Sequence, residues 1–283
     1  MQTLQRGWNK NLNEVFQSVD KELVVSSPYI SDVGVEFLLD NVSNKFKEKG
    51  VLKFVTDLSP RNIYQGATDP NSFKLLFKSI NTIQIFHLPR LHAKVYISDE
   101  KKAIVTSGNL TAGGMYNNFE YGVFIDEAKT ISLIKNDLVG YGNLGATINS
   151  SEIDTYCSIS DETKELYRQR EKSSKKEIES KFKKAVSKAN DELIKAKLGE
   201  GALHSVFEKS IHYLLQKNGP LPTIAIQILI QEIHPDLCDN DVDKVINGVH
   251  FGKKWKHVVR TSIQNFKKKG FVELINGNWT LIK

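Results

Sequence analysis

Cysteine is scarce in this chain. Only two occur among 283 residues, Cys157 and Cys238, and they lie in different segments. Neither belongs to a CxxC pattern or to a cysteine and histidine cluster of the kind that binds zinc. We therefore expect neither a disulfide framework nor a metal site, and nothing in the sequence asks for another cofactor.

Long apolar runs are also missing. No stretch approaches the roughly 18 residues that a membrane span needs. The N-terminal segment MQTLQRGWNKNLNEVF lacks the apolar stretch of a secretory signal. We expect a cytoplasmic protein without a membrane partner. The composition, 40% hydrophobic and 25% charged, is that of a globular protein, and the length favours two domains.

Positive charge is concentrated towards the C-terminus. Residues 1–160 hold 16 basic and 17 acidic side chains (net −1), residues 161–200 hold 12 and 9 (net +3), and residues 201–283 hold 11 and 7 (net +4), which together make the total of +6. From His250 onward eight Lys and Arg side chains accompany a single acid, Glu273. Such a surface is suited to phosphate, and the alternative is an ordinary solvated face.

The first 130 residues alternate short apolar strands with helical patterns, which is typical of an α/β layer. Helices are expected at 33–49 and 72–79. The expected strands are 23–26, 51–56, 83–86, 93–98, 102–106 and 120–125, the last of which closes the sheet. We therefore predict a mixed sheet flanked by helices, in a catalytic domain that spans residues 1–160.

A charged segment follows this domain. Residues 161–198 contain no Pro or Gly, which predicts a long helix. Its apolar residues recur at steps of three or four and form one narrow seam: Ile178, Phe182, Ala185, Ala189, Leu193 and Ala196. The seam packs either on its own domain or on a partner helix. We treat residues 161–200 as a helical linker and a candidate dimer contact, with a boundary marked by Gly199 and Gly201.

Residues 201–283 are expected to form a small α+β domain. Helices are predicted at 203–217 and 223–233, and a third helix follows. Two strands, 271–275 and 279–282, flank Asn276-Gly277-Asn278, and Asn-Gly between apolar stretches is a strong hairpin signal. Helices followed by a terminal hairpin are the outline of a winged helix-turn-helix.

The segment GKKWKHVVRTSIQNFKKKG, residues 252–270, separates an apolar helical face from a basic one. The apolar face carries Trp255, Val258, Val259, Ser262, Ile263 and Phe266. The predicted DNA contacts are Lys253, Lys254, Lys256, His257, Arg260, Gln264, Lys267 and Lys268. The lysines would meet phosphates, while Arg260 or Gln264 would read base edges. Winged helices also bind proteins, so both kinds of ligand stay open.

Chemically active side chains gather between residues 91 and 120, in LHAKVYISDEKKAIVTSGNLTAGGMYNNFE. His92 and Lys94 lie two residues apart, which places them on one face of a strand. The return strand ends in Thr106-Ser107-Gly108-Asn109, so a hydroxyl and an amide lie beside His92. An imidazole, an ammonium, an amide and a hydroxyl without acidic metal ligands make a pocket that suits a phosphate and supplies a nitrogen nucleophile.

This pattern resembles the motif of the phospholipase D superfamily, in which His-x-Lys, four residues and Asp are followed, six residues later, by a small residue and Ser-x-Asn. The positions are filled by His92, Lys94, Asp99, Thr106 in place of the usual Gly, Ser107 and Asn109. Glu120 stands where members of the superfamily carry an acid that orients the histidine. Ser26-Ser27-Pro28-Tyr29 resembles the opening strand, and the likeness covers roughly residues 20 to 126.

The resemblance implies a mechanism that needs no metal. His92 would attack phosphorus to form a phosphohistidine, with Glu120 holding the imidazole in the attacking tautomer. Lys94 and Asn109 would stabilise the charge on the non-bridging oxygens, and Ser107 would hydrogen-bond within the cluster.

Three neighbouring features are expected to be structural. Asp99 should stabilise its turn, because an aspartate side chain readily bonds the local backbone. His87 has no matching constellation around it. Gly113-Gly114 lacks the Gly-Lys-Ser/Thr element of a phosphate loop and is interpreted as a turn.

The superfamily builds one active site from two such motifs, and this chain has one. The resemblance therefore implies a homodimer in which His92 of each subunit faces the other across a twofold axis. It also implies a metal-independent DNA endonuclease, similar to the restriction endonucleases of the superfamily. The alternatives are a hydrolase of lipids or small phosphodiesters and a catalytically silent DNA-binding regulator.

Overall fold

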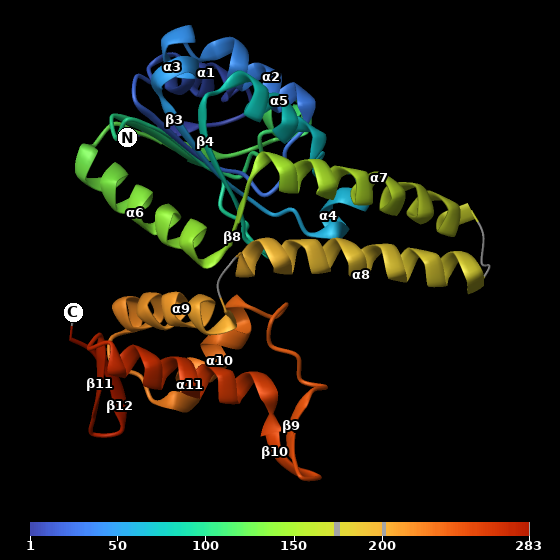
Figure 1. Cartoon of the computed structure of the whole chain (residues 1–283). Helices are drawn as coiled ribbons and strands as arrows, with labels where there is room; N and C mark the ends of the chain where they lie inside the picture. The colour runs from blue at the N-terminus through green and yellow to red at the C-terminus, as the bar shows by residue number, and fades with distance from the viewer. Residues whose placement is uncertain (173–175, 200–201, 283) are drawn as a thin grey trace. The chain divides into compact units, whose positions relative to one another are not determined.

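The computed structural model describes residues 1–172, 176–199 and 202–282. The chain forms two compact units, Met1–Ala196 and Lys197–Lys283, and each has its own hydrophobic core (Figure 1). Among the described helices, none combines the length and the apolar character needed to cross a bilayer.

The first unit is built on a mixed sheet whose described strands follow the order β1-β7-β6-β5-β2-β3-β4-β8. The pairs β2·β3 and β3·β4 are parallel, and the other neighbouring pairs are antiparallel. The strands are β1 (Gln2–Leu4), β2 (Glu22–Ser26), β3 (Val51–Thr56), β4 (Thr82–His87), β5 (Val95–Ser98), β6 (Lys102–Thr106), β7 (Gly122–Ile125) and β8 (Ala146–Ile148). This mixed α/β fold confirms the predicted sheet.

Both edges of the sheet differ from the prediction. The strand expected at 120–125 does not close the sheet, because β1 pairs outside β7. At the other edge β8 pairs with β4. Both edge strands have three residues, which is too short for an alternation of apolar and polar residues to stand out in a sequence.

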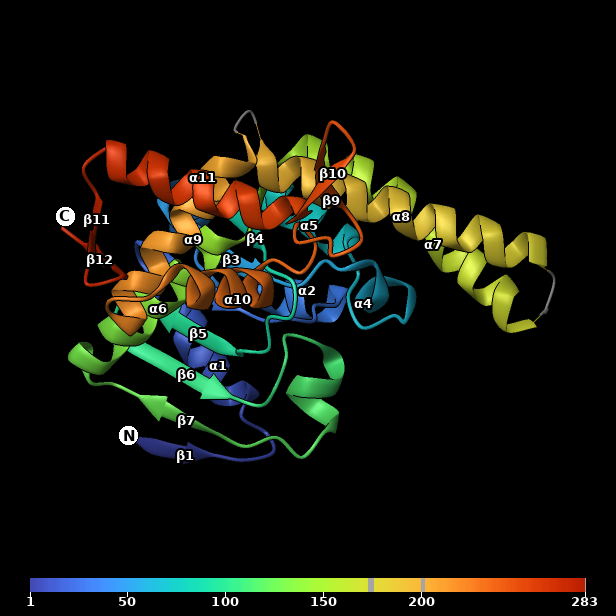
Figure 2. The same ribbon diagram turned by 90° about the horizontal axis from the view of Figure 1, so that it is seen from below.

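Helices cover both faces of the sheet (Figures 1 and 2). Leu23 and Val25 of β2 face the larger core, while Val24 between them faces the smaller core beneath α6. This central strand is therefore buried on both sides, as its unbroken apolar run requires. The helices of the unit are α1 (Asn9–Gln17), α2 (Asp32–Asn41), α3 (Asn44–Lys49), α4 (Pro60–Tyr64), α5 (Asn71–Ser79), η1 (Gly113–Asn117), α6 (Ala128–Leu144), α7 (Ser150–Lys172) and α8 (Lys176–Leu198).

The helix predicted at 33–49 is two helices, α2 and α3. Val42 is extended, and Ser43 begins the second helix by accepting a hydrogen bond from the backbone N–H of Phe46. The Gly113-Gly114 pair begins the short helix η1 and does not form the predicted turn.

The charged helix predicted at 161–198 is also two helices, the C-terminal part of α7 and the whole of α8, and residues 173–175 between them lie outside the described residues. Four residues of its seam are buried in the first unit: Phe182, Ala185, Ala189 and Leu193. The seam therefore packs on its own domain, which is one of the two alternatives left open by the sequence. The structure divides the chain at Ala196, whereas residues 200–201 of the predicted boundary lie outside the described residues.

In the described part of the second unit, three helices pack against one core, and two separate hairpins accompany them. The core holds Phe207 and Ile211 of α9, Ile226 of α10 and Val259 of α11, among others. Leu221 forms an isolated bridge with Trp279 of the terminal hairpin. The elements are α9 (Leu203–Asn218), α10 (Thr223–Ile233), β9 (Asp243–Ile246), β10 (Val249–Lys253), α11 (Lys254–Lys268), β11 (Val272–Ile275) and β12 (Asn278–Leu281).

Candidate active site

Three neighbouring strands place every residue predicted to act in catalysis at one end of the sheet, where β5 and β7 begin and β6 ends. We call this end of the strands the edge, in contrast to the edge strands β1 and β8. Figure 2 shows β5, β6 and β7 side by side. Val95 lies opposite Val105, and Thr106 lies opposite Gly122. The segment before β5 is therefore next to the segment after β6, which in turn adjoins the segment before β7. These three segments carry His92 and Lys94, Ser107 and Asn109, and Glu120.

His92 and Lys94 precede β5, which begins only at Val95. The two-residue alternation of a strand therefore does not apply to them: His92 is exposed, whereas Lys94 is only 5% exposed. The Lys94 ammonium donates to the carbonyl oxygen of His92 at 2.9 Å. Lys94 stays attached to the sheet through its own carbonyl, which accepts from the Thr106 N–H at 3.1 Å.

Burial lowers the pKa of Lys94, and the negative charge of Glu120 offsets part of that shift. This ammonium still has unused donor capacity, because its hydrogen bond to the His92 carbonyl, the one it makes among the described residues, occupies one of three N–H groups. It is thus well suited to receive an anionic oxygen.

Glu120 is bound to neighbouring residues of the same edge. Its carboxylate accepts from the Ser107 hydroxyl and, at 3.0 Å, from the Asn118 amide. The Ser107 hydroxyl in turn accepts from the backbone N–H of Tyr121 at 3.0 Å. In the single chain that the structure describes, Glu120 is therefore engaged by Ser107 and Asn118, and its orienting role toward His92 stays a prediction.

Asn109 is placed by close backbone packing. A side chain at position 114 would come within 2.4 Å of the Asn109 carbonyl oxygen, so only glycine fits at Gly114. The next residue, Leu110, donates its N–H to the Ser27 hydroxyl at 2.9 Å. The Asn109 Oδ1 atom is buried and has no hydrogen-bond donor among the described residues. Such an unsatisfied atom is costly in a core and is a recognised feature of functional sites.

A supporting layer beneath the site was not predicted. The Tyr96 hydroxyl donates to the Gly108 carbonyl at 3.1 Å, and the Trp8 indole donates to the Gly114 carbonyl at 2.7 Å. The Trp8 ring also lies so close to Gly108 that an added side chain would approach it to 2.5 Å. The hydrogen bond of Trp8 joins residues 106 positions apart, so no local pattern in the sequence indicates it.

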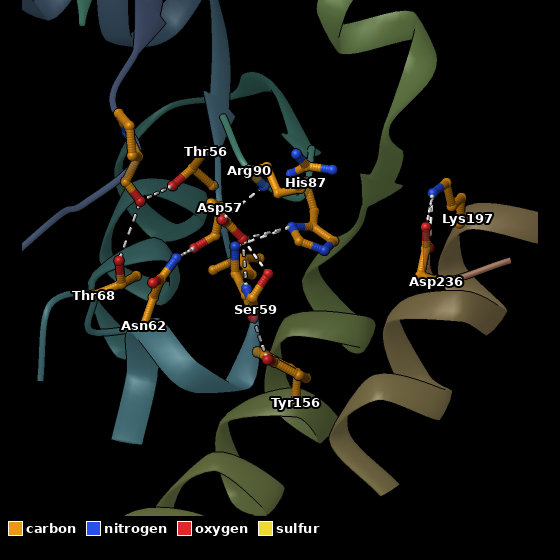
Figure 3. Close-up of polar contacts among 12 residues, drawn as sticks. Thr56, Asp57, Ser59, Asn62, Thr68, His87, Arg90, Tyr156, Lys197 and Asp236 are labelled. Carbon is orange, nitrogen blue, oxygen red and sulfur yellow. Dashed lines mark hydrogen bonds and ion pairs between the residues drawn. The ribbon is translucent and has the colours of Figure 1, made fainter. Parts of the chain in front are cut away.

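A second polar cluster lies at the ends of β3 and β4 (Figure 3). The Asp57 carboxylate accepts from the N–H and hydroxyl of Ser59 and from the Arg90 N–H at 3.0 Å. His87 is 3% exposed, and its Nδ1 atom accepts from the Leu58 N–H at 3.0 Å. Because Nδ1 is an acceptor there, it carries no proton, and the imidazole fixes the local backbone as a structural histidine does.

Asp99 lies at the end of β5 remote from the site. Its carboxylate accepts from the backbone N–H groups of Asp20, Lys21 and Glu22 at 2.7 to 2.9 Å. Burial alone would raise the pKa of Asp99, but these hydrogen bonds outweigh burial and lower it. The motif aspartate is structural, as predicted, but its carboxylate bonds a segment remote in sequence and not the local backbone of its own turn.

The predicted DNA contacts lie on and just before α11. Its apolar face is buried through Trp255, Val259, Ser262, Ile263 and Phe266. Three of the predicted contacts already have partners in their own unit: Lys253 pairs with Asp243 at 2.7 Å, His257 bonds the Phe251 carbonyl at 2.7 Å, and Lys256 lies over the Trp255 ring. The exposed members are Lys254, Arg260, Gln264, Lys267 and Lys268.

Residues 12–139 match the family model described as "Cardiolipin synthase, PLD-like domain". This part of the chain is similar to a PLD-like domain. The match includes the whole edge that carries His92, Lys94, Ser107, Asn109 and Glu120. The mixed sheet flanked by helices matches the PLD-like fold.

A curated protein and several solved structures are similar to parts of this chain. The DISARM protein DrmC of Bacillus paralicheniformis is 49% identical over 49 residues, which are 17% of this chain and 20% of that protein. The chain thus matches about a fifth of the length of that relative.

Two solved structures resemble about half of this chain. Nuc from Salmonella typhimurium, a phospholipase D family member, is 17% identical, with 53% of this chain and 99% of that chain covered and a TM-score of 0.42. NucT from Helicobacter pylori is 13% identical, with 52% and 99% covered and a TM-score of 0.41.

Proposed function

We propose that this chain is a metal-independent endonuclease that cuts DNA through a phosphohistidine intermediate. One observation carries the proposal: exposed His92 and buried Lys94, whose ammonium donates to the His92 carbonyl, lie at the same end of the sheet as Ser107, Asn109 and Glu120. The PLD-like domain supplies the phosphodiesterase fold. The basic character of the second unit favours DNA as the substrate.

In the proposed reaction an imidazole nitrogen of His92 attacks phosphorus, and the bond to the leaving oxygen breaks as the phosphohistidine forms. Lys94 and Asn109 stabilise the negative charge of the non-bridging oxygens. A second imidazole gives its proton to the leaving oxygen. That imidazole then takes a proton from water, which attacks the phosphohistidine, frees His92 and leaves a phosphate monoester end.

The second imidazole is proposed to be His92 of another copy of the chain, in a homodimer with a twofold axis beside the site. A mixed dimer tests this arrangement. Wild-type and His92→Ala chains with different tags would be co-expressed and purified through both tags. A shared site needs both imidazoles, so the mixed dimer is expected to be inactive. Half of the wild-type rate would contradict a shared site.

The second unit is proposed to be a winged-helix DNA-binding domain. Its support is topological. An isolated bridge pairs Leu221, just before α10, with Trp279 of the hairpin β11·β12, since the backbones of the two residues exchange hydrogen bonds at 2.8 and 3.1 Å. The helix α11 would be the recognition helix, and Asn276 to Asn278 would be the tip of the wing.

One experiment tests the endonuclease. Wild-type protein and the His92→Ala variant are incubated with plasmid DNA in EDTA. Cutting by the wild type alone supports the proposal. Binding without cutting by both proteins contradicts it and points to a catalytically silent DNA-binding regulator.

A second candidate function is the hydrolysis of a lipid or another small phosphodiester. It is favoured by one observation, the description of the matching family model, which names cardiolipin synthase. The same pair of proteins would be incubated with vesicles that contain cardiolipin or phosphatidylglycerol. Release of a headgroup by the wild type alone, together with indifference to DNA, would replace the endonuclease by the lipid enzyme.

A further inference from the structure

The hairpin β9·β10 lies between α10 and α11 in the chain. It is not part of the predicted outline of helices followed by a terminal hairpin. Ile246 pairs with Val249, so the turn has two residues, Asn247 and Gly248. Both have a positive φ, 50° and 79°, which is the conformation of a tight type I′ turn. The tip of this hairpin is therefore a short and well-defined structure.

The hairpin is tied to the start of α11. The Lys254 N–H donates to the Val242 carbonyl at 2.9 Å, and His257 Nε2 bonds the Phe251 carbonyl at 2.7 Å. Because a carbonyl oxygen only accepts, His257 is the donor in this bond. These two bonds hold the base of the hairpin against the start of the basic helix.

The single acid of the hairpin is neutralised within it. Asp243 pairs with Lys253 at 2.7 Å and with His250 at 3.1 Å. Its hydrogen bonds with Lys253 and His250 hold the pKa of the Asp243 carboxyl below its usual range. Over residues 243–268 seven Lys and Arg side chains accompany this one acid, so the hairpin and helix together favour a polyanion.

The hairpin also exposes large apolar side chains on both of its faces. Val245 and Ile246 are neighbours in sequence and point to opposite faces, yet they are 50% and 47% exposed. Val249 and Phe251 on the other strand are 55% and 51% exposed. None of the four belongs to the core of the unit. An ordinary hairpin buries one face, so this surface is expected to meet a partner.

A cleft of about 440 Å³ lies at the base of the hairpin, between it and α11. Its lining carries two lysines, Lys244 and Lys254, and one acid, Asp243, which is paired with Lys253, and α11 has no acidic residue in its first turn. The other polar residues of the lining are His204, His257 and Thr261. Such a cleft suits a phosphate of a nucleic-acid backbone beside the apolar tip.

We propose that the hairpin β9·β10 is a second DNA-contacting arm, whose apolar tip residues Ile246 and Val249 enter a groove of duplex DNA while α11 holds the adjacent backbone. Architectural proteins insert apolar side chains between base steps in this way. The inference rests on the proposed function, since it takes DNA as the ligand of the second unit. Charge decides between DNA and a protein as the occupant, because the apolar tip rises from a strongly basic surface.

The test measures the binding of the full chain to a fluorescently labelled 30-base-pair duplex over a series of KCl concentrations. The hairpin variant is Ile246→Ser with Val249→Ser. Its matched control is Ile224→Ser, which removes an equally apolar and more exposed side chain of α10, 71% exposed. A charge variant, Lys256→Ala with Arg260→Ala, tests the helix. Circular dichroism melting of each variant verifies that it is folded.

The hairpin variant is expected to bind about tenfold more weakly, with an unchanged slope of log affinity against log salt, because no cation has been removed. The Ile224 control should match the wild type, and the charge variant should bind more weakly with a flatter slope. Wild-type affinity in the hairpin variant would overturn the inference and assign the apolar tip to a protein, while the charge variant would still report on DNA binding. Failure of the wild type to bind DNA would overturn the proposed function itself.

Discussion

Two polar clusters lie at the ends of strands of the same sheet. They contain similar residue types but differ in their hydrogen bonding. One contains His92, Ser107 and Glu120 at the ends of β5, β6 and β7. The other contains His87, Ser59 and Asp57 at the ends of β3 and β4 (Figure 3). Each has an imidazole, a hydroxyl and a carboxylate, so residue types alone do not distinguish them.

The two clusters differ in whether backbone N–H groups already bond their imidazole and carboxylate. In the Asp57 cluster, the backbone N–H of Leu58 occupies the imidazole, and those of Ser59 and Arg90 occupy the carboxylate. In the His92 cluster the imidazole is exposed, and a neighbouring ammonium retains donor capacity. The comparison shows that the proposed catalytic cluster differs from the other in the hydrogen-bonding groups that it leaves available to a ligand.

The sharpest test of this comparison replaces each histidine in turn. His92→Ala is expected to lower plasmid cleavage in EDTA at least about a thousandfold, because the nucleophile is lost. His87→Ala should keep the rate within about tenfold while lowering the free energy of unfolding by about 1–3 kcal/mol, because the Leu58 N–H loses its acceptor. Initial rates and denaturant unfolding measure the two effects. A thousandfold loss in folded His87→Ala would remove the distinction.

The next largest effect is expected at Asn109. Replacement by alanine removes one donor to the non-bridging oxygens and should lower the rate about a hundredfold to a thousandfold. The matched control is Asn62→Ala in the other cluster, where the amide donates to the Asp57 carbonyl at 3.3 Å. Initial rates of plasmid cutting compare the two variants. Equal losses would show that polar contacts along the whole edge contribute alike.

Asp57→Ala tests whether the Asp57 cluster supports the His92 cluster. The substitution leaves the N–H groups of Ser59 and Arg90 without their acceptor and should cost about 2–4 kcal/mol in the free energy of unfolding. Arg90 has a positive φ of 66° and lies two residues before His92, so a smaller loss of activity is expected as well. Urea unfolding measures the stability. An unchanged midpoint would show that the Asp57 carboxylate does not hold this turn.

Much of the sheet follows from local patterns, because buried strands and their polar ends are visible in the sequence. Val51–Thr56 and Lys102–Thr106 have the predicted bounds, and the register of the β5·β6 hairpin brings the motif residues to one edge. The supporting contacts of Trp8 and Ser27 could not be predicted, since they join segments far apart in sequence and depend on packing.

The two hairpins of the second unit show where pattern reasoning ends. Asn276-Gly277 was used to predict a hairpin, but Asn247-Gly248, preceded by the same Ile, was not. The difference lies in the flanking strands. Trp279 of the terminal hairpin is buried and marks a core face, whereas the residues around Asn247 are exposed and show no buried face to predict. At Asn247-Gly248 the sequence contains the turn signal, but the flanking strands have no buried face that would support a hairpin prediction.

The smallest expected effect concerns the titration of Lys94, a group with no counterpart in the Asp57 cluster. The proposed mechanism needs the ammonium form. Because burial lowers the pKa of Lys94, the rate is expected to fall as pH rises through a value below the ordinary 10.5. Lys94→Arg keeps its charge throughout this range and should lose the alkaline decline, even where its geometry lowers the rate. Rate profiles from pH 7 to 10.5 measure the difference. If the rate of the arginine variant fell at the same pH as that of the wild type, the titrating group would not be Lys94. The charge of Lys94 would then not control the rate.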